Sequence, residues 1–322
     1  MTSPLLQVKN LVTYFDTRKG PVKAVDGISY DVNKGEIVAL VGESGCGKTV
    51  SALSLLRLIP QPPGRIVSGE AWFEGKDLLQ LGKDEIRRIR GCKISVVFQE
   101  PMTSLNPVFT IGRQLSEGML EHGTVDRANV KSECVRLLDI VGIPDAERLD
   151  QYPGQFSGGM RQRVMIAMAL ACTPSIIIAD EPTTAVDVTI QAQLLELLHS
   201  VTQRFETAVL LITHNMGIVA KYAHRVNVMY AGRIVEQASV DEIFSNPQHP
   251  YTRALLQCIP RADHDRLDKL CPIEGQPPDL IQRPSGCPFH PRCLCTQPEC
   301  MMEWPTLAEV TERHLVACPY IT

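Results

Sequence analysis

The chain has 322 residues, 44% of them hydrophobic and 21% charged, and a net charge of −4 at pH 7. This composition is that of a globular protein, and the length suffices for one large domain and a smaller one. The slightly acidic balance does not support nucleic-acid binding, which usually depends on a basic face.

The chain carries no segment that predicts a membrane span. Its longest apolar run, from Val164 to Cys172, is about half of the roughly 20 residues that a spanning helix needs. The N-terminal residues MTSPLLQVKN lack the basic-then-apolar pattern of a signal peptide. We therefore expect a cytosolic chain that depends on other subunits for any work across a membrane. The eleven cysteines do not indicate a disulfide framework, because the cytosol is reducing.

The first part of the chain alternates between strand-like and helical segments, which favours an α/β fold. Three segments predict a small antiparallel layer: about 5–9, 22–32 and 70–74. Four continuous apolar runs predict buried parallel strands: 37–41, 94–98, 176–179 and 208–212.

Between about residues 103 and 165 the strands stop and helical spacing takes over. The apolar residues that repeat at this spacing are Val130, Cys134, Leu137, Leu138 and Val141. We interpret this stretch as a helical insertion in the α/β core. The segment 189–205 is also amphipathic, and core packing explains its apolar face. After about residue 240 prolines become frequent and periodicity fades, which predicts an irregular C-terminal extension.

A phosphate-binding loop follows the apolar run at 37–41. The sequence Gly42-Glu43-Ser44-Gly45-Cys46-Gly47-Lys48-Thr49 matches the P-loop pattern, and a plausible helix begins at Val50. Glycines let backbone N–H groups face phosphate oxygens, and the helix N-terminus adds a favourable partial charge. We expect Lys48 to reach the β- and γ-phosphates of ATP and Thr49 to ligate Mg²⁺.

Polar residues at three further strand ends complete a hydrolytic site. Asp180 suits the coordination of Mg²⁺, and the adjacent Glu181 can orient and polarise the attacking water. Gln99 and His214 each follow a predicted strand, at the edge where α/β sheets bind ligands. Gln99 would contact Mg²⁺ or the water, and His214 the γ-phosphate. Alone, each would more often be a structural or surface residue; together they point to catalysis.

Taken together, these motifs resemble the ATP-binding subunit of an ABC transporter, over about residues 5–237. The most specific element is Ser157-Gly158-Gly159-Met160-Arg161-Gln162, which matches the family signature. In that family the signature opens a helix and points at the γ-phosphate bound by the opposite subunit. A helix N-terminus preceded by serine and glycines suits this purpose, because it offers N–H donors to an anion. The resemblance therefore implies that Ser157, Gly158, Gly159 and Gln162 contact a partner's ATP.

Other positions carry over one by one. Phe15, or less well Tyr14, matches the aromatic residue that stacks on adenine. Gln99 matches the hinge glutamine, His214 the switch histidine, and 184–187 the loop that crosses the dimer interface. The departures, such as Cys46 where serine is common, remove no catalytic group. The resemblance therefore implies that the four signature residues and twelve others contact nucleotide: Phe15, Gly42, Glu43, Ser44, Gly45, Cys46, Gly47, Lys48, Thr49, Val50, Gln99 and Asp180. It also implies that the Mg²⁺ ligands are Thr49, Gln99 and Asp180.

The C-terminal part is similar to that of peptide-type importers for dipeptides, oligopeptides and nickel. The resemblance rests on Asn246-Pro247-Gln248-His249-Pro250-Tyr251-Thr252 and on Gly286-Cys287-Pro288-Phe289-His290-Pro291-Arg292-Cys293. In that group four cysteines are associated with an iron–sulfur cluster. This implies a [4Fe–4S] cluster on Cys287, Cys293, Cys300 and Cys318, with Zn²⁺ or unligated thiols as the alternatives.

The expected architecture is thus a P-loop NTPase core with an antiparallel layer and a helical insertion, plus a small irregular extension. We expect a nucleotide-binding domain at 1–240, with its helical subdomain at about 103–165, and the extension at 241–322. The resemblance implies an ATPase that powers uptake of peptides or related solutes. It also implies a second ATPase subunit (a heterodimer is favoured), two membrane-spanning permeases and, indirectly, an extracytoplasmic solute-binding protein. The chain would then lie at the cytoplasmic face of the inner membrane, with docking near Gln99 and 101–107.

Two rival interpretations stay open at this point. A soluble ABC ATPase of a non-transport machine typically carries tandem cassettes, a long coiled coil or a basic face, and the sequence shows none of these. A binding module with a dead site would lack catalytic groups, whereas Lys48, Asp180, Glu181 and His214 are all present.

Overall fold

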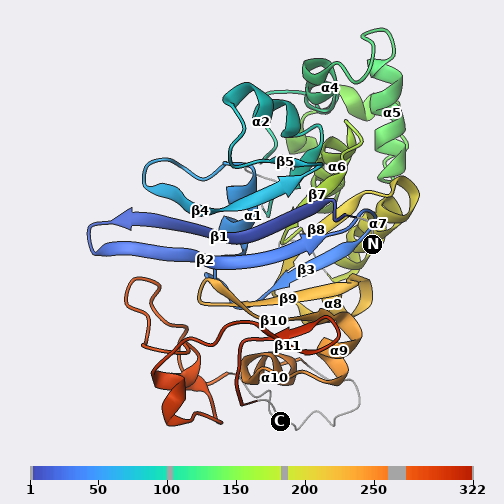
Figure 1. The fold of residues 1–322 in the computed structure, drawn as a ribbon. Helices are drawn as coiled ribbons and strands as arrows, with labels where there is room; N and C mark the ends of the chain where they lie inside the picture. Colours follow the sequence, from blue (N-terminus) through green and yellow to red (C-terminus); the bar gives the residue numbers. More distant parts are fainter. Residues whose placement is uncertain (1–2, 100–103, 183–187, 260–272, 321–322) are drawn as a thin grey trace. The chain divides into compact units, whose positions relative to one another are not determined.

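The computed structural model describes residues 3–99, 104–182, 188–259 and 273–320 (Figure 1). The chain divides into two compact units. The first comprises Met1–Val32, Val38–Gln80 and Ile212–Thr322, and the second comprises Asn33–Ile37 and Leu81–Leu211.

An antiparallel sheet in the first unit has the strand order β2-β1-β4-β5. Its long central strand pairs with β2 from Leu6↔Val32 to Thr17↔Gly20 and with β4 from Leu6↔Phe73 to Phe15↔Gly64 (Figure 1). The strands are β1 (Leu6–Thr17), β2 (Gly20–Val32), β4 (Gly64–Phe73) and β5 (Lys76–Asp77). This sheet is the predicted antiparallel layer, with strands longer than expected.

A second set of strands in the first unit runs in the order β11-β12-β10-β9-β3. All five residues of β3 (Ile37–Val41) are buried, as a continuous apolar run requires. β3 runs parallel to β9, so the carboxyl end of β3, at Val41, lies beside Val228. The remaining strands are β9 (Arg225–Tyr230), β10 (Arg233–Ser239), β11 (Ala308–Thr311) and β12 (His314–Val316).

The C-terminal extension is tied to the core by a buried glutamate. Glu236 on β10 accepts hydrogen bonds from the backbone N–H groups of Gln248 (2.7 Å) and His249 (2.9 Å). Its carboxylate also lies 2.7 Å from Nε2 of the buried His314 on β12. A buried carboxylate needs such partners. The helical elements of this unit are α1 (Lys48–Leu55), α8 (Met216–Tyr222), α9 (Val240–Ser245), α10 (Pro250–Gln257), η3 (His290–Arg292) and η4 (Pro298–Met301).

The second unit combines parallel strands with the helical insertion. β6 (Ile94–Val97) and β7 (Ile176–Asp180) are parallel, and β8 (Ala208–Thr213), whose last two residues belong to the first unit, is the other neighbour of β7. The helix α5 (Val130–Ile140) buries Val130, Cys134, Leu137 and Leu138, as predicted. The other helical elements are α2 (Lys83–Ile89), α4 (Ile111–His122), η1 (Ala146–Asp150), η2 (Pro153–Gln155), α6 (Gly158–Leu170) and α7 (Val188–Phe205).

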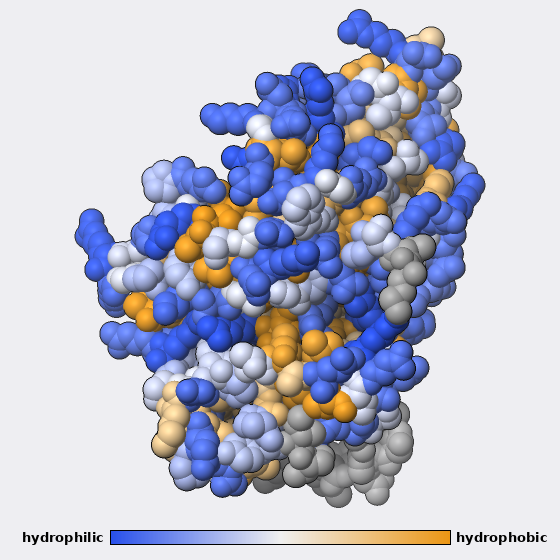
Figure 2. Space-filling model, in the orientation of Figure 1, coloured by the Kyte–Doolittle hydropathy of each residue, from blue (hydrophilic) through white to orange (hydrophobic). Residues whose placement is uncertain are grey.

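The hydropathy of the surface is that expected of a globular protein with this composition. The face in Figure 2 is mostly hydrophilic, with hydrophobic side chains in separate areas. Among the described helices, we find none whose length and apolar character would let it cross a bilayer.

Candidate nucleotide-binding site

The phosphate loop connects β3 to α1 and depends on glycines at both ends. Gly42 has φ +151°, and a Cβ there would lie 2.1 Å from the carbonyl oxygen of Met229. Gly47 has φ +106°, and its Cβ would lie 2.0 Å from the carbonyl oxygen of Ala24. No side chain fits at either position, because both the backbone conformation and the neighbouring strands exclude it. The loop is thus pressed against the core, while Ser44, Gly45 and Thr49 are exposed.

Lys48 lies folded along this loop. Its side chain is 5% exposed, and Nζ donates to the carbonyl oxygens of Gly42 (2.8 Å) and Glu43 (3.0 Å). An ammonium group offers three donors in any direction, so it can exchange these carbonyl oxygens for phosphate oxygens. The position of Lys48 therefore suits the phosphate-binding role predicted for it.

Cys46 occupies an interior position in the loop. Its carbonyl oxygen accepts a hydrogen bond from the N–H of Gly232 (2.9 Å), in the turn between β9 and β10. Burial raises the pKa of the Cys46 thiol, although the neighbouring Lys48 opposes this shift. Cys46 is therefore a protonated, packed side chain at neutral pH.

The two aromatic candidates for adenine stacking have different surroundings. Tyr14 donates its hydroxyl hydrogen to Asp26 (2.7 Å), and burial followed by this bond raises the pKa of Tyr14. Phe15 is half-buried beside β4, where a Cβ at Gly64 would lie 2.9 Å from its ring. The tyrosine is engaged within the protein, which favours Phe15 for the role.

In the second unit, two predicted catalytic residues meet directly. Gln99, just after β6, donates from Nε2 to the Oε2 atom of Glu181 (3.1 Å). Glu181 follows β7 and has φ +44°, a left-handed backbone that is rare for a residue other than glycine. Such strain recurs at functional sites. Asp180, the last residue of β7, is 6% exposed.

The predicted signature opens α6, as the resemblance implied. Ser157 is the N-cap residue, and its Oγ accepts a hydrogen bond from the N–H of Met160 (3.3 Å). Ser157 and Gly158 are exposed, so the first turn of the helix faces solvent. Gly159 allows a close approach of α7, because a Cβ there would lie 2.8 Å from Cγ2 of Ile190. The signature therefore presents an open helix N-terminus on a closely packed pair of helices.

Gln162 has different surroundings from the rest of the signature. It is fully buried, and its Nε2 donates to the carbonyl oxygen of Pro182, the residue after Glu181. This bond links α6 to the segment that carries the acid pair. In this conformation Gln162 does not face a nucleotide, so any effect on ATP would pass through Pro182 and Glu181.

The remaining predicted residues are placed as follows. His214 is exposed and directly follows β8. The loop 184–187 and residues 101–103 lie outside the described residues. The phosphate loop, Phe15 and His214 belong to the first unit, whereas Gln99, Asp180, Glu181 and the signature belong to the second. The roles assigned to these residues stay predictions.

Two residues without a predicted role contact the phosphate loop. Arg292 and Tyr251 both bond to Glu43, from positions 249 and 208 residues away in the sequence. A local motif carries no signal for contacts at such separations, although both residues lie within the two segments that carry the peptide-importer resemblance.

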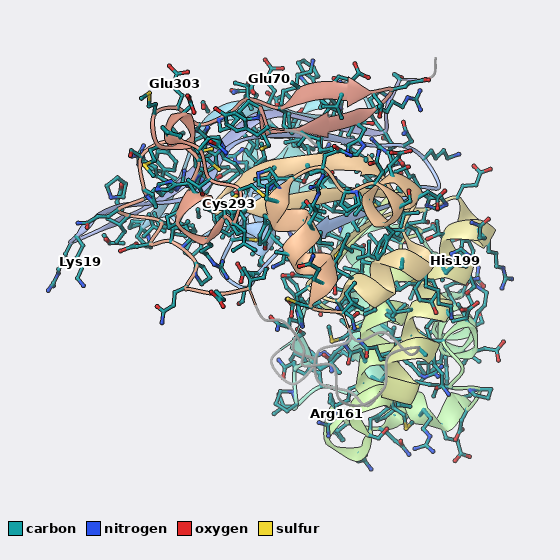
Figure 3. The ribbon with its side chains drawn as sticks, turned by 90° about the horizontal axis from the view of Figure 1, so that it is seen from below. Lys19, Glu70, Arg161, His199, Cys293 and Glu303 are labelled. Atoms are coloured by element: carbon teal, nitrogen blue, oxygen red, sulfur yellow. The ribbon has the colours of Figure 1, made fainter. Side chains whose placement is uncertain are left out.

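The predicted iron–sulfur cluster is wrong. Within the described ranges, no group of three or more His, Cys, Asp or Glu side chains is arranged to hold a metal ion, and this finding also covers the zinc alternative. Cys287, Cys293, Cys300 and Cys318 instead line a cavity of about 20 Å³ together with apolar groups such as Phe289. A cavity of this size has room for about one water molecule. Burial raises the pKa of Cys287 to about 11, so its thiol is protonated at neutral pH in this structure. Figure 3 marks Cys293 in this part of the chain.

Comparison with solved structures defines the class of the protein. The fold is similar to the dimeric structure of MJ0796, a bacterial ABC transporter cassette, with a TM-score of 0.65 and 25% identity over 73% of this chain and 98% of that chain. This likeness confirms the predicted fold class of a P-loop NTPase cassette.

Sequence comparison defines the family. The ABC transporter family matches residues 25–184, and the C-terminal region of oligopeptide/dipeptide transporters matches residues 235–300. The dipeptide transport ATP-binding protein DppD of Bacillus subtilis is 49% identical over 98% of this chain and 94% of its own length. The oligopeptide transport ATP-binding protein OppD of the same organism is 47% identical over 97% of this chain and 87% of its own length. The chain therefore belongs to the ABC transporter ATP-binding proteins of the oligopeptide/dipeptide type, and it is an ATPase of that family. Neither family description nor either relative's name indicates an iron–sulfur protein, which agrees with the lack of a metal-binding group among the described residues.

Proposed function

We propose that this chain hydrolyses ATP to power the uptake of peptides through a membrane ABC importer. The observation that carries the proposal is the similarity to DppD over nearly the whole of both chains, including the C-terminal region. The phosphate loop and the acid pair supply the chemistry that such an ATPase needs. The soluble-machine alternative gains no support from these relatives.

ATP binding falls to the residues of the phosphate loop. Lys48 leaves the carbonyl oxygens of Gly42 and Glu43 and donates to the phosphates, and the N-terminus of α1 contributes backbone N–H groups to the same phosphates. Thr49, Gln99 and Asp180 carry oxygen ligands of the type that Mg²⁺ prefers, and they would hold this ion. When bound, Mg²⁺ neutralises charge that develops on the phosphates.

Hydrolysis falls to Glu181. Its carboxylate orients a water molecule for in-line attack on the γ-phosphoryl group and accepts the proton that this water loses, while the bond from the γ-phosphorus to the β–γ bridging oxygen breaks and ADP leaves. Gln99 donates to the same carboxylate, which supports its orientation. The exposed His214 supplies a donor for the γ-phosphate.

The partners follow from the signature. Ser157 and Gly158 lie at an open helix N-terminus that the phosphate loop of the same chain does not require. We therefore place this helix N-terminus against ATP bound by a second ATPase subunit. The dimeric structure of the MJ0796 cassette supports a dimer. We favour a heterodimer, with two permeases in the membrane and a solute-binding protein outside it, and we place the chain at the cytoplasmic face of the inner membrane.

For the domain organisation, we propose a nucleotide-binding domain at 1–240, with its helical subdomain at about 103–165, and an extension at 241–322.

Reconstitution tests the function. The full chain, its ATPase partner and the permeases are placed in lipid vesicles with the solute-binding protein, and uptake of a radiolabelled dipeptide is measured with ATP. We expect uptake that requires ATP and is lost with Lys48→Ala in this chain. Normal uptake in vesicles that lack this chain would refute the proposal, as would failure of the chain to copurify with membrane-spanning subunits.

A further inference from the structure

Every polar group of Glu43, the second residue of the phosphate loop, is engaged within the first unit. Its N–H donates to the hydroxyl oxygen of Tyr251 (2.9 Å), and its carbonyl oxygen accepts from Nζ of Lys48 (3.0 Å). Its carboxylate accepts two hydrogen bonds from Arg292. Two of these three partners belong to the C-terminal extension, so the extension holds the loop directly.

The bond between Arg292 and Glu43 is bidentate. Nη1 lies 2.6 Å from Oε2, and Nη2 lies 2.9 Å from Oε1. Two parallel charge-assisted bonds fix orientation as well as distance. The side chain of Arg292 is only 4% exposed, and the Glu43 side chain is 25% exposed. Solvent therefore weakens this pair far less than a surface ion pair.

The extension also fixes the other side of the guanidinium group. Nε of Arg292 donates to the carbonyl oxygen of Glu274 (2.9 Å), and Nη2 donates to that of Ile273 (3.3 Å). Nη1 is also 3.3 Å from the hydroxyl oxygen of Tyr230. These bonds fix the position of the Arg292 guanidinium group independently of its contact with Glu43.

Tyr251 is equally well fixed. Its ring lies with Tyr230 and Phe289 in a buried triangle, in which the ring centroids are 4.5 to 5.3 Å apart. Aromatic rings at these separations pack favourably and leave little room for rotation. The hydroxyl group of Tyr251 is therefore a stationary acceptor for the N–H of Glu43.

We propose that Arg292 and Tyr251 are positioning residues that hold the phosphate loop in its ATP-binding shape, so that the C-terminal extension sets the affinity for ATP. The loop contains glycines with left-handed backbones at Gly42, Gly45 and Gly47, which have many other conformations available when unrestrained. A loop that is ordered before ATP arrives binds more tightly, because less ordering accompanies binding. Glu43 is the point at which the extension supplies that order.

The inference separates binding from chemistry. In the proposed function, the hydrolytic step depends on Glu181, Gln99 and His214 and not on the carboxylate of Glu43. Loss of the Arg292 bond should therefore weaken ATP binding and leave the hydrolytic step at saturating ATP nearly unchanged. A contact that merely attaches the extension would instead lower stability and leave ATP affinity as it was.

The test measures the dissociation constant of a non-hydrolysable ATP analogue with Mg²⁺, by calorimetry on the full chain. We expect Arg292→Gln to raise this constant about tenfold, which corresponds to about 1.4 kcal/mol. Tyr251→Phe removes only the hydroxyl group and keeps the ring triangle, and we expect a rise of about threefold. In the assembled transporter the KM for ATP should rise with the same variants, while kcat stays within about twofold.

Arg225→Gln is the matched control. Arg225 makes a similar two-bond contact with Asp31 (3.3 and 3.0 Å) in the same unit. It lies beside Val38, near the opposite end of β3 from the phosphate loop. We expect this variant to lose stability without any change in ATP affinity. If Arg292→Gln fails to fold, Tyr251→Phe decides, because its core packing is intact.

A double-mutant cycle and a labelling experiment complete the design. Arg292→Gln combined with Glu43→Gln should bind the analogue no more weakly than the weaker single variant, because both remove the same contact. Alkylation of Cys46, followed by peptide mass spectrometry, should be faster in Arg292→Gln, since a looser loop exposes this buried thiol.

Unchanged analogue affinity in Arg292→Gln and Tyr251→Phe would overturn the inference, and so would an equal loss in Arg225→Gln. The inference rests on the proposed ATP site. Binding of the analogue to the wild-type chain distinguishes a failure of the proposed function from a failure of the positioning role. Absence of binding to wild type would refute the proposed function, whereas wild-type binding with no change in the variants would refute the positioning role alone.

Discussion

Glu181 combines a backbone that is costly with a side chain that has a defined partner. A left-handed backbone at a residue other than glycine costs of the order of 1–3 kcal/mol and persists only where the surroundings impose it. Here the bond from Gln99 fixes the carboxylate. The sequence identified the acid pair from its position after a strand, but the backbone strain is visible only in the structure.

The first prediction concerns this carboxylate. Glu181→Gln keeps the size and the neutral contacts of the side chain but removes the proton acceptor. We expect kcat for ATP hydrolysis to fall by about 10²–10⁴, with ATP affinity within about twofold of wild type. Glu117→Gln, a change at an exposed glutamate on α4, serves as the control and should leave both values unchanged. Hydrolysis by Glu181→Gln at the wild-type rate would exclude the catalytic role.

His249 is a buried histidine at the start of α10. Its Nδ1 accepts a hydrogen bond from the N–H of Tyr251 (3.1 Å), which caps the helix. Burial lowers the pKa of His249 to about 3, from an ordinary value of 6.5. The unfolded chain therefore binds a proton between about pH 6.5 and pH 3, and the folded chain does not. By linkage, the stability of the fold decreases as the pH falls through this window.

The second prediction follows from that difference in pKa. Between pH 7.5 and pH 5.0, His249 should account for a loss of about 2 kcal/mol in the free energy of unfolding, at about 1.4 kcal/mol per pH unit below 6.5. His249→Asn keeps a capping acceptor and removes the titrating ring. Urea unfolding at the two pH values should show a loss in wild type that exceeds the loss in His249→Asn by that amount. Equal losses in the two proteins would contradict the assignment.

At the scale of elements, apolar runs were the most reliable signal. The four runs predicted as buried strands are β3, β6, β7 and β8, each within one residue of its predicted end. Burial on both faces favours apolar residues at nearly every position, so the run itself marks the strand.

The antiparallel layer was harder to predict. β1 extends over Leu6–Thr17, whereas only its first residues were predicted, because exposed residues such as Lys9 and Asn10 interrupt the alternation. Asn10 also has φ +47°, at a shift in the strand register. The contacts of the extension with Glu43 and Glu236 were beyond prediction, because they depend on tertiary packing between distant residues.

Neighbouring glycines of the signature have different roles in the packing of helices. A Cβ at Gly159 would lie 2.8 Å from Cγ2 of Ile190, near the start of α7, whereas a Cβ at Gly158 meets no atom within 4 Å. Gly159 therefore permits the close approach of α6 and α7, and Gly158 does not contribute to it.

The third prediction uses this contrast. Gly159→Ala should lower the free energy of unfolding by about 1 kcal/mol, because the cost of overpacking exceeds the gain in helix propensity. Gly158→Ala is the matched control and should be neutral or slightly stabilising. Combining Gly159→Ala with Ile190→Ala should remove the overpacking. Urea unfolding measures all four proteins, and equal stability of the two single glycine variants would show that α7 yields without cost.

At the scale of the whole molecule, the chain carries one phosphate loop and one signature. The phosphate loop belongs to the first unit, and the signature presents an open helix N-terminus in the second. If the signature contacts the partner's ATP, a substitution in it should leave ATP binding by the isolated chain unchanged. Its effect should be seen only in the assembled transporter.

The fourth prediction tests this expectation with two substitutions of the same residue, Ser157. Ser157→Asp and Ser157→Asn both keep a good N-cap, so both should fold with stability near that of wild type. Only the aspartate places a negative charge where the γ-phosphate of the partner's ATP would lie, and this charge should repel it. We expect both variants to bind an ATP analogue normally as isolated chains, and only Ser157→Asp to lose ATP hydrolysis in the assembled transporter.

The extent of that loss reports the composition of the motor. In a homodimer every ATP meets an altered signature, so Ser157→Asp should abolish hydrolysis. In a heterodimer the change affects only the partner's ATP. The site that pairs this chain's phosphate loop with the partner's signature is intact, so hydrolysis should persist at one of the two sites. Weaker binding of the analogue by the isolated Ser157→Asp chain, with normal binding by Ser157→Asn, would instead show that the signature acts on ATP in its own chain.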